Sequence, residues 1–342
     1  MTFSRRALLA SAAATVFALL PSCNRDSGKI KIGVVTNNPE DFWNIVEKGA
    51  KDAAEKQGVE LHFRRPEKAE AGIQRNIINE LVSKGVKGVA VSVINPEEQS
   101  LDLKLIADET NLITMDNDAK DSGRICYVGT NNYEAGQAVG RLVKEAMPDG
   151  GTVAVLVGQI TPINARLRVQ GVLDELAGAK GAKGPTFGKY TLYRNEPITD
   201  GGQRSTSVEN AKDAIERLTG QPNVCMVGLW AYNPPAILEA AKSKGVAGKI
   251  KIVGFDEDPD TLKAIETGEV YATVVQDPYN FGYKSVEILA DIAKTGDKAK
   301  YAKDQNIMYR VVVKEAAKDP VTGADRLGVQ KFREDLNRLL GK

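Results

Sequence analysis

Histidine is almost missing from this sequence, since His62 is the only one among 342 residues. A metal motif built on two histidines is therefore excluded, and a catalytic triad would have to use this single side chain. His62 lies in the alternating stretch Leu61-His62-Phe63, which is typical of a short strand, and a surface or packing role explains it. Most hydrolase mechanisms are disfavoured, and we expect neither an enzyme nor a bound cofactor or metal.

An excess of positive charge is also lacking. Lysine and arginine number 46, aspartate and glutamate 45, and the formal net charge is +1. Proteins that bind nucleic acid neutralise phosphates with clustered basic residues, so nucleic acid is not an expected partner. The lysine-rich segment 294–303 is explained by a solvated connector, and the glycine-rich segment 178–188 has no P-loop lysine pattern.

The sequence contains no apolar run of the roughly 20 residues that a helix needs to cross a bilayer. Its longest apolar run, 7–20, follows Ser4-Arg5-Arg6 and precedes Leu20-Pro21-Ser22-Cys23, which is the order of regions in a signal peptide. The first motif resembles a twin-arginine export signal, and the second resembles a bacterial lipobox, whose cysteine is acylated after cleavage. An ordinary secretory signal cut near Ser22 is the alternative. We expect a signal peptide over 1–22, a tether over 23–29, and an exported body attached to the membrane only through a lipid on Cys23.

Cysteine is scarce in the body, where only Cys126 and Cys225 remain. Each lies in a short apolar run, 125–128 and 224–227. Small buried cysteines are common, and two distant ones give little support for a bridge. Buried free thiols are therefore expected, although a disulfide stays open to an exported protein.

What the body does contain is an alternation of apolar strand-like runs and amphipathic helical segments. The expected strands lie at 30–35, 59–63, 86–93, 112–115, 152–157, 187–193, 224–229, 250–255, 271–276 and 307–313. The expected helices lie at 42–57, 69–83, 97–108, 133–146, 165–176, 208–218, 234–243, 260–266 and 279–293. This alternation favours an α/β fold with parallel sheets covered by helices on both faces. The pattern alone leaves two architectures open, a β/α barrel and a pair of doubly wound lobes.

Aromatic, amide and charged residues gather where these strands end, the place at which parallel α/β sheets bind ligands. These positions are 36–43, 94–96, 116–118, 158–168, 230–233, 255–256 and 276–277. Aromatic rings cover the apolar face of a sugar ring, while carboxylates accept hydrogen bonds from hydroxyls and arginine or asparagine donates to them. The composition therefore suits a polyhydroxylated ligand.

Several short motifs at these positions occur in an informative order. They are Asn37-Asn38-Pro39 with Phe42-Trp43, Ile94-Asn95-Pro96, Thr114-Met115-Asp116, Asn164 with Arg168 and Gly171, Val253-Gly254-Phe255-Asp256, and Val274-Val275-Gln276. In this order they resemble the ribose-binding-protein family of periplasmic sugar receptors, over residues 29–296. The resemblance implies two Rossmann-like lobes joined by a three-segment hinge, with the ligand between them, and so favours lobes over a barrel. The implied lobes are 29–130 plus 277–306, and 131–276 plus 307–342.

The resemblance also implies which residues hold the ligand. Phe42 and Trp43 would stack on a sugar from one lobe. Asn95 and Asp116 of the same lobe would bind its hydroxyls. Arg168, Asp256 and Gln276 would contact the sugar from the other lobe and the hinge. The full expected set is Asn38, Phe42, Trp43, Asn95, Asp116, Asn117, Asn164, Arg168, Trp230, Asn233, Asp256 and Gln276.

The sequence departs from the family pattern in three places. Glu40-Asp41 lengthens the segment before the aromatic pair. Asn117 stands where the ribose receptor has an arginine after its aspartate, and Trp230-Ala231 replaces an Asn-Asp pair. Asn233 would restore an amide near the second change. The expected ligand is therefore a pentose or a small hexose, without a choice between them.

Plain structural roles exist for some of these residues. A Phe-Trp pair at a helix start also packs in cores, and an aspartate after a strand also caps the next helix. Asp118 and Asp258 are better placed as caps than Asp116 and Asp256, which favours the latter two as ligand contacts.

These expectations favour the substrate-binding protein of an ABC importer, a monomer that captures a monosaccharide by hinge closure and delivers it to a membrane permease. A sensor that presents a sugar or signal molecule to a membrane receptor is the alternative, which the sequence does not separate from uptake. A LacI-type repressor would need a helix-turn-helix headpiece, and none lies between Cys23 and Ile30. A retaining glycosidase using Asp116 and Asp256 would need these carboxylates about 5 to 5.5 Å apart.

Overall fold

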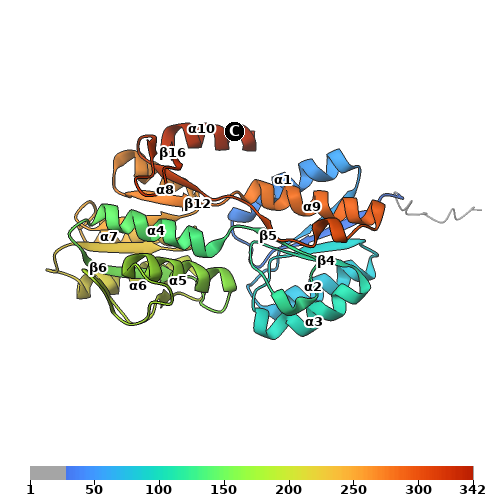
Figure 1. Cartoon of the computed structure of the whole chain (residues 1–342), viewed down its shortest axis with the longest axis horizontal. Coiled ribbons are helices and arrows are strands. Elements are labelled where there is room, and N and C mark those ends of the chain that lie inside the picture. Colours follow the sequence, from blue (N-terminus) through green and yellow to red (C-terminus); the bar gives the residue numbers. More distant parts are fainter. Residues whose placement is uncertain (1–27, 342) are drawn as a thin grey trace, which may run out of the picture.

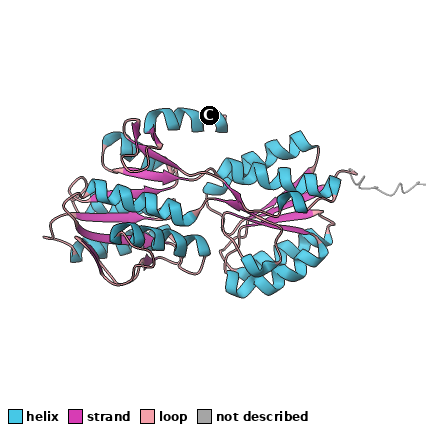
Figure 2. Cartoon of the chain, in the orientation of Figure 1, coloured by secondary structure: helices cyan, strands magenta, loops and turns pink. Residues whose placement is uncertain are grey.

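The computed structural model describes residues 28–341 as two lobes, each built on a central sheet with helices on both faces (Figure 1; Figure 2). The two separate sheets confirm the doubly wound lobes and exclude the barrel. The expected signal peptide and Cys23 lie outside the described residues.

The first lobe contains a six-stranded parallel sheet with the order β13-β5-β4-β3-β1-β2. Its elements are β1 (Lys31–Val35), α1 (Phe42–Gln57), β2 (Glu60–Arg64), α2 (Ala71–Ser83), β3 (Gly88–Val91), α3 (Pro96–Glu109), β4 (Asn111–Met115), the 3-10 helix η1 (Lys120–Ser122), β5 (Tyr127–Gly129), α9 (Pro278–Thr295), the 3-10 helix η2 (Ala299–Tyr301) and β13 (Gln305–Asn306). Strands β3 and β4 are almost wholly buried, as expected for strands covered on both faces.

The second lobe contains a larger sheet with the order β15-β16-β14-β12-β11-β10-β6-β8-β7, in which β9 also pairs with β6. Its elements are α4 (Asn132–Ala146), β6 (Gly151–Val157), α5 (Ile163–Ala177), β7 (Thr186–Phe187), β8 (Tyr190–Leu192), β9 (Ile198–Thr199), α6 (Arg204–Arg217), β10 (Val224–Gly228), α7 (Asn233–Ser243), β11 (Lys251–Phe255), α8 (Pro259–Thr267), β12 (Ala272–Val275), β14 (Arg310–Val313), β15 (Ala317–Lys318), β16 (Asp325–Gly328) and α10 (Val329–Leu340). The strands β6, β10, β11 and β12 run parallel, while β14 joins β12 in the opposite direction.

The chain passes between the two sheets three times. It leaves the first sheet after β5, returns after β12 to form α9 and β13, and leaves again before β14. Helix α9 packs closely on α1. A Cβ atom added to Gly49 of α1 would lie only 2.0 Å from the carbonyl oxygen of Tyr279 on α9, so glycine is required at this crossing. The exact lobe boundaries at 130/131, 276/277 and 306/307 stay a prediction.

The structure corrects several of the expected elements. The single strand expected over 187–193 is the hairpin of β7 and β8, which turns at Gly188 with a φ of +59°. The segment after residue 313, for which no element was expected, forms β15, β16 and α10. Cys126 and Cys225 are buried free thiols, as expected, and burial raises the pKa of the first to about 11 and of the second to about 12.

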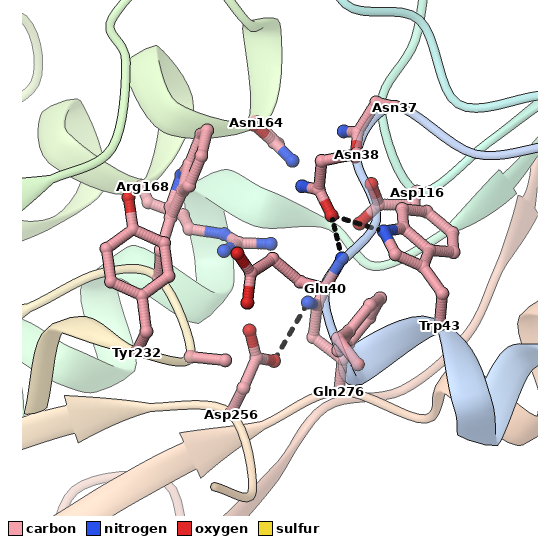
Figure 3. Close-up of a pocket in the computed structure, with 13 residues that line it drawn as sticks. Asn37, Asn38, Glu40, Trp43, Asp116, Asn164, Arg168, Tyr232, Asp256 and Gln276 are labelled. Carbon is pink, nitrogen blue, oxygen red and sulfur yellow. Dashed lines mark hydrogen bonds between the residues drawn. The ribbon is translucent and has the colours of Figure 1, made fainter. Parts of the chain in front are cut away.

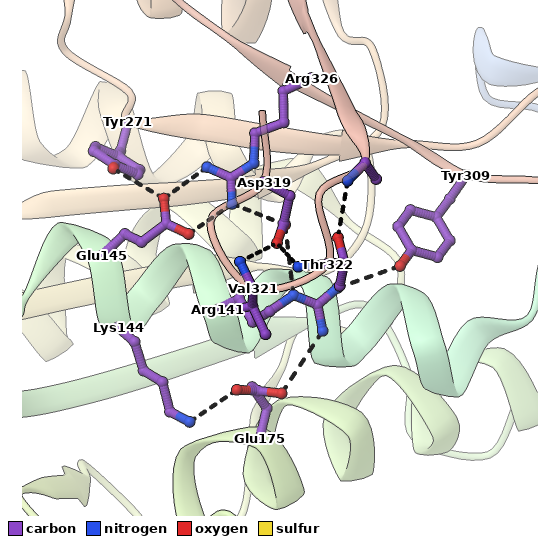
Figure 4. Close-up of polar contacts among 11 residues, drawn as sticks. Arg141, Lys144, Glu145, Glu175, Tyr271, Tyr309, Asp319, Val321, Thr322 and Arg326 are labelled. Carbon is purple, nitrogen blue, oxygen red and sulfur yellow. Dashed lines mark hydrogen bonds and ion pairs between the residues drawn. The ribbon is translucent and has the colours of Figure 1, made fainter. Parts of the chain in front are cut away.

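A buried charge network attaches the C-terminal strands to α4 (Figure 4). Arg326 of β16 donates to both carboxylate oxygens of Glu145, at 2.7 and 2.6 Å, and to Asp319 at 2.9 Å. Asp319 also accepts backbone N–H groups from Val321 and Thr322. Burial alone would raise the pKa of Asp319, but these hydrogen bonds hold it well below its usual range. The segment that follows β14 is therefore an integral part of the second lobe.

Candidate functional site

A cleft between the lobes collects side chains from the carboxyl ends of both sheets (Figure 3). Its lining residues are Asn37, Asn38, Glu40, Phe42, Trp43, Asp116, Asn164, Arg168, Trp230, Ala231, Tyr232, Asp256 and Gln276. The residues up to Asp116 belong to the first lobe, and those from Asn164 onward follow strands or begin helices of the second. This is the position at which doubly wound sheets bind ligands.

Asp116 and Asp256 occupy matching positions in the two lobes, directly after β4 and β11. Both have left-handed backbones, with φ of 58° and 67°. Their N–H groups donate to Val128 (3.0 Å) and Val274 (2.8 Å) on the neighbouring strands. A left-handed conformation costs a residue other than glycine about 1–3 kcal/mol, and such strain clusters at functional sites. In both lobes this bend ends the strand at the cleft, where the aspartate lines the wall.

Arg168 is fixed on α5 by three contacts. Its Nε donates to Asn132 at 2.8 Å and its Nη1 to the carbonyl of Leu229 at 2.9 Å. The guanidinium carbon lies 3.9 Å from the centre of the Phe255 ring. Arg168 is 2% exposed, and its Nη2 has no hydrogen-bond partner among residues 28–341. The guanidinium of Arg168 is therefore held in one position, and its Nη2 remains available to donate hydrogen bonds to a ligand.

Close packing of α5 against α4 sets the position of this arginine. A Cβ atom on Gly136 of α4 would lie 2.2 Å from the carbonyl oxygen of Arg168, and one on Gly171 would lie 2.2 Å from that of Tyr133. Only glycine fits at these two crossing points, so the helices approach each other backbone to backbone. The Gly171 spacing noted in the sequence thus has a direct physical reason.

Burial dominates the electrostatics of the cleft. It raises the pKa of Asp116 to about 6, while attraction to Arg168 and a 2.8 Å hydrogen bond from Ser92 lower it by less. Burial likewise raises the pKa of Asp256, against attraction to Arg168 and a 2.9 Å hydrogen bond from Gln276. Burial lowers the pKa of Arg168, and both aspartates oppose that shift. One guanidinium therefore faces two buried carboxyl groups.

Two aromatic pairs flank this charged centre. Phe42 and Trp43 are arranged edge to face, with ring centres 5.2 Å apart, and Trp43 donates through Nε1 to Asn38 at 2.8 Å. Trp43 is only 1% exposed and anchors the start of α1 in the core. On the other lobe Trp230 and Tyr232 form a second edge-to-face pair at 6.1 Å. Each lobe thus offers aromatic surface to the cleft.

Five lining residues carry a buried polar atom without a hydrogen-bond partner among residues 28–341. These atoms are Asn37 Oδ1, Asn164 Oδ1, Arg168 Nη2, Trp230 Nε1 and Gln276 Oε1. Buried polar groups in folded proteins are nearly always hydrogen-bonded, to the protein, to water or to a ligand. Their concentration in one cleft indicates a place built for a polar ligand.

The single histidine does not take part in this cleft. His62 lies on β2, where its Nε2 is 2.9 Å from Glu60, outside the lining. Within the described part of the chain, no cluster of three metal-ligating side chains occurs. The helices described there also include none that could span a membrane. The cleft offers hydrogen bonds, charge and aromatic faces, which are the means of binding.

A family model described as periplasmic binding protein domain matches residues 32–298. The chain belongs to this family. Among its relatives, the D-allose-binding periplasmic protein of Escherichia coli K12 is 24% identical over 273 residues, or 76% of this chain and 82% of that protein. The ribose import binding protein of Salmonella typhimurium is 27% identical over 286 residues, or 80% and 88%.

Solved structures show the same relationship. A solute-binding protein from Burkholderia graminis in complex with D-arabinose is 26% identical, with a TM-score of 0.76 over 84% of this chain and 96% of the other. A glucose-galactose binding protein from Geobacillus stearothermophilus is 28% identical, with a TM-score of 0.74 over 84% and 98%. The expectation of a ribose-binding-like protein, and of a binding protein rather than an enzyme, is confirmed at the level of the family.

Nine of the twelve expected ligand contacts of this binding protein come together in the cleft. They are Asn38, Phe42, Trp43, Asp116, Asn164, Arg168, Trp230, Asp256 and Gln276. These residues are up to 238 positions apart in the sequence, and the two sheets bring them to one place because parallel strands end at a common edge. Their contacts with a ligand stay a prediction.

The other three expected residues lie outside this lining, and their contact with a ligand stays a prediction. Asn95 caps α3, where its side chain accepts from the N–H of Glu98. Asn117 donates to the carbonyl of Val93 and accepts from the N–H of Asn164. Their amides serve the backbone, as asparagine does at turns and caps.

Asn233 is the third of these residues, and its amide is fully occupied inside the second lobe. Its Nδ2 donates to Asp200 (2.8 Å) and Ser207 (3.0 Å), and its Oδ1 accepts from the N–H of Trp230 (2.9 Å). It is 0% exposed. It therefore positions Trp230 and does not itself reach the cleft.

Four lining residues were not among the expected contacts: Asn37, Glu40, Ala231 and Tyr232. Glu40 belongs to the two-residue insertion before the aromatic pair, which was noticed only as a departure from the family. Tyr232 follows Trp230-Ala231 and donates to Asp200 at 2.6 Å. The available signal was that all four lie in the stretches 36–43 and 230–233, which follow β1 and β10.

Two contacts join the lobes beside the cleft. Asn117, after β4, accepts from the backbone of Asn164 on α5 at 3.2 Å. Arg166 of α5 forms an ion pair with Glu97 of α3 at 2.6 Å. The lobes therefore touch directly beside the cleft.

Proposed function

We propose that this chain is the extracytoplasmic substrate-binding protein of an ABC importer and that it captures a monosaccharide, a pentose or small hexose, in the cleft. The observation that carries the proposal is the arrangement of Arg168 against two buried aspartates, surrounded by unpartnered polar atoms and aromatic faces. Ring hydroxyls both donate and accept, so they satisfy carboxylates, amides and a guanidinium together. Relatives that bind allose, ribose and arabinose support the sugar class.

Capture would follow from closure of the lobes around the sugar. The cleft residues come from both lobes, so only the closed form makes all contacts at once. A ligand shifts a conformational equilibrium by its preference for one form, and the sugar would therefore stabilise the closed form. The closed monomer would then dock on a permease in the membrane, and no chemistry on the sugar is required.

The proposal places the protein outside the cytoplasmic membrane, as its periplasmic relatives are. Export would use the signal at 1–22, which resembles a twin-arginine signal, and a lipid on Cys23 would retain the protein at the membrane. Mass spectrometry of the protein purified from membranes tests this, because an acylated N-terminal peptide beginning at Cys23 is expected. A soluble product beginning elsewhere would contradict the anchor.

A thermal-shift screen against aldoses, ketoses and polyols tests the binding function. A ligand that binds only the folded form stabilises it by RT ln(1 + [L]/Kd), about 2.7 kcal/mol at a hundredfold excess over Kd. We expect one or a few monosaccharides to raise the melting temperature of the wild type. Arg168→Met should abolish the shift, because two buried carboxyl groups lose their cation, a loss of about 2–5 kcal/mol. The exposed Arg217→Met serves as a control, and a folded wild type that no monosaccharide stabilises would overturn the proposal.

A further inference from the structure

The two-residue insertion before Phe42 places one additional carboxylate in the cleft. The N–H of Glu40 donates to Asn38 Oδ1 at 3.0 Å, and its carbonyl accepts from the N–H of Trp43 at 3.1 Å. These bonds hold the backbone of Glu40 at the cleft, and its side chain reaches inward (Figure 3). The second inserted residue, Asp41, is bound instead by Asn44 at 2.9 Å and lies outside the lining. Of the two inserted carboxylates, that of Glu40 therefore lines the cleft and that of Asp41 does not.

This additional carboxylate leaves the lining with more negative than positive charge. The charged lining residues are Glu40, Asp116, Asp256 and Arg168, so three acids face a single base. Partial burial raises the pKa of Glu40, although the residue stays exposed at the mouth, and attraction to Arg204 across the cleft only partly opposes this shift. Arg204 itself is 46% exposed and lies 3.6 Å from Glu239 and 3.9 Å from Asp260. Arg168 is therefore the one basic side chain among the lining residues of the described cleft.

Among the unpartnered polar atoms of the lining, hydrogen-bond acceptors likewise outnumber donors. Three of them accept hydrogen bonds, on Asn37, Asn164 and Gln276, while two donate, on Arg168 and Trp230. Together with the three carboxyl groups, the cleft calls for a ligand that donates more hydrogen bonds than it accepts. A hydroxyl supplies one donor along with acceptor lone pairs, whereas an ammonium group supplies three donors, no acceptor and a positive charge.

We propose that the cleft selects a monosaccharide that carries a protonated primary amine over its neutral counterpart, with Glu40 receiving the ammonium group. This inference rests on the proposed function, since it specifies the ligand of the same site. Hydrogen bonds between charged groups are roughly twice as strong as neutral ones. Binding of the amine therefore depends on the Glu40 charge far more than binding of the neutral sugar does.

Titration calorimetry near pH 7 with matched sugar pairs tests the inference. The pairs are D-glucose and D-glucosamine, D-galactose and D-galactosamine, and D-mannose and D-mannosamine, with N-acetyl-D-glucosamine as an uncharged amide. The wild type should bind the amine of at least one pair about tenfold more tightly than its neutral partner. Glu40→Gln should weaken binding of the amine far more than binding of the neutral sugar, and so remove the preference. Asp41→Asn removes the neighbouring charge outside the lining and should keep the preference.

The other outcomes are separable. Neutral sugars that bind as tightly as their amines would overturn this inference and leave the proposed function standing. Equal weakening of both members of a pair by Glu40→Gln would also overturn it, since Glu40 would then be an acceptor for hydroxyls only. If no sugar of either kind binds the folded protein, the proposed function fails together with the inference.

Discussion

Asp116 combines a strained backbone with a buried carboxyl group. Both features place the carboxyl group at the cleft, and both lower the stability of the ligand-free folded protein. Its φ of 58° and its raised pKa are each unfavourable for folding. In the unfolded chain an aspartate has a pKa of about 3.9, whereas in the folded protein the pKa of Asp116 is about 6. The folded state therefore holds more protons than the unfolded chain between these values.

The first prediction concerns this titration. Because the folded state binds the proton more tightly, the contribution of Asp116 to stability should fall as the pH rises from about 4 to about 6. Asp116→Asn removes the titrating group, so its stability should change less across that window than that of the wild type. Sugar affinity of the variant should drop by about 1.5–3 kcal/mol, the scale of a hydrogen bond to a charged group.

Urea unfolding at several pH values and calorimetry with the sugar from the screen measure the two effects. Asp118→Asn is unsuitable as a control, since Asp118 pairs with Arg124; the exposed Asp121→Asn carries the same change on the surface. A wild-type curve that rises between pH 4 and 6 and is matched by the Asp116 variant would show that Asp116 does not titrate there.

At the residue scale, the sequence predicts the charged centre better than the amides. Asp116 and Asp256 follow apolar strands, and that position alone determines their place at the cleft. Asn95 lies four residues beyond the end of β3 and Asn117 two beyond the end of β4, and their amides bond to nearby backbone instead. The direction of a short polar side chain depends on local backbone geometry, which residue spacing does not encode. Glu40 was missed because an insertion has no family position to compare with.

The α4–α5 helix pair is where element packing controls the site. The second prediction is that Gly171→Ala destabilises the protein by about 1–3 kcal/mol, because the added methyl group would lie 2.2 Å from the carbonyl oxygen of Tyr133. The helices must separate, and Arg168, one turn away from residue 171, moves with α5. Urea denaturation measures the loss in stability, and calorimetry measures the accompanying loss in sugar affinity.

Gly72→Ala on α2 is the matched control. No atom lies within 4 Å of a Cβ placed there, and the residue is helical without a positive φ. Alanine should be neutral or stabilise by up to about 1 kcal/mol, as it does at a compatible helical glycine. If both variants behaved alike, the close approach of α4 and α5 would not be what demands glycine at position 171.

At the element scale, hydrophobic periodicity located the long helices and central strands within a few residues. The α1 range was correct at both ends, since Phe42 begins the apolar pattern and Gly58 ends it with a left-handed φ of 67°. The two-residue strands β9 and β13 are too short to carry a period. Helix α10 was overlooked although Val329, Phe332 and Leu336 recur at helical spacing.

The contact between lobes acts on the molecule as a whole. Glu97 and Arg166 are 63% and 43% exposed, and ion pairs of this kind contribute about 0–1 kcal/mol. The third prediction is that Glu97→Gln lowers sugar affinity by no more than about fivefold. The change should shrink further in high salt, because screening already weakens the wild-type pair.

Calorimetry at low and high salt measures this effect, with Glu109→Gln at the far end of α3 as the control. Small-angle scattering without sugar should show a larger fraction of open molecules for the Glu97 variant. A loss of affinity far beyond fivefold, or one that salt does not alter, would mean that Glu97 contacts the ligand or supports the fold of α3.

The whole-molecule architecture followed from the alternation of strands and helices, but the choice of lobes over a barrel did not. Both folds place polar residues at strand ends, and only the ordered motifs distinguished them. The threefold passage of the chain between the sheets is a long-range property, set by which strand edges pair, and no local pattern reports it.

That threefold passage also governs the order in which the molecule can be made. The first lobe is begun by β1 but lacks α9 and β13 until residues 278–306 have been synthesised. Until then the face of α1 around Gly49 lacks the helix that packs on it. The second lobe likewise waits for β16 and α10, at residues 325–340. A nascent chain therefore completes neither half before residues 278–306 have been synthesised, and a chain that stops between β6 and α9 has two incomplete lobes.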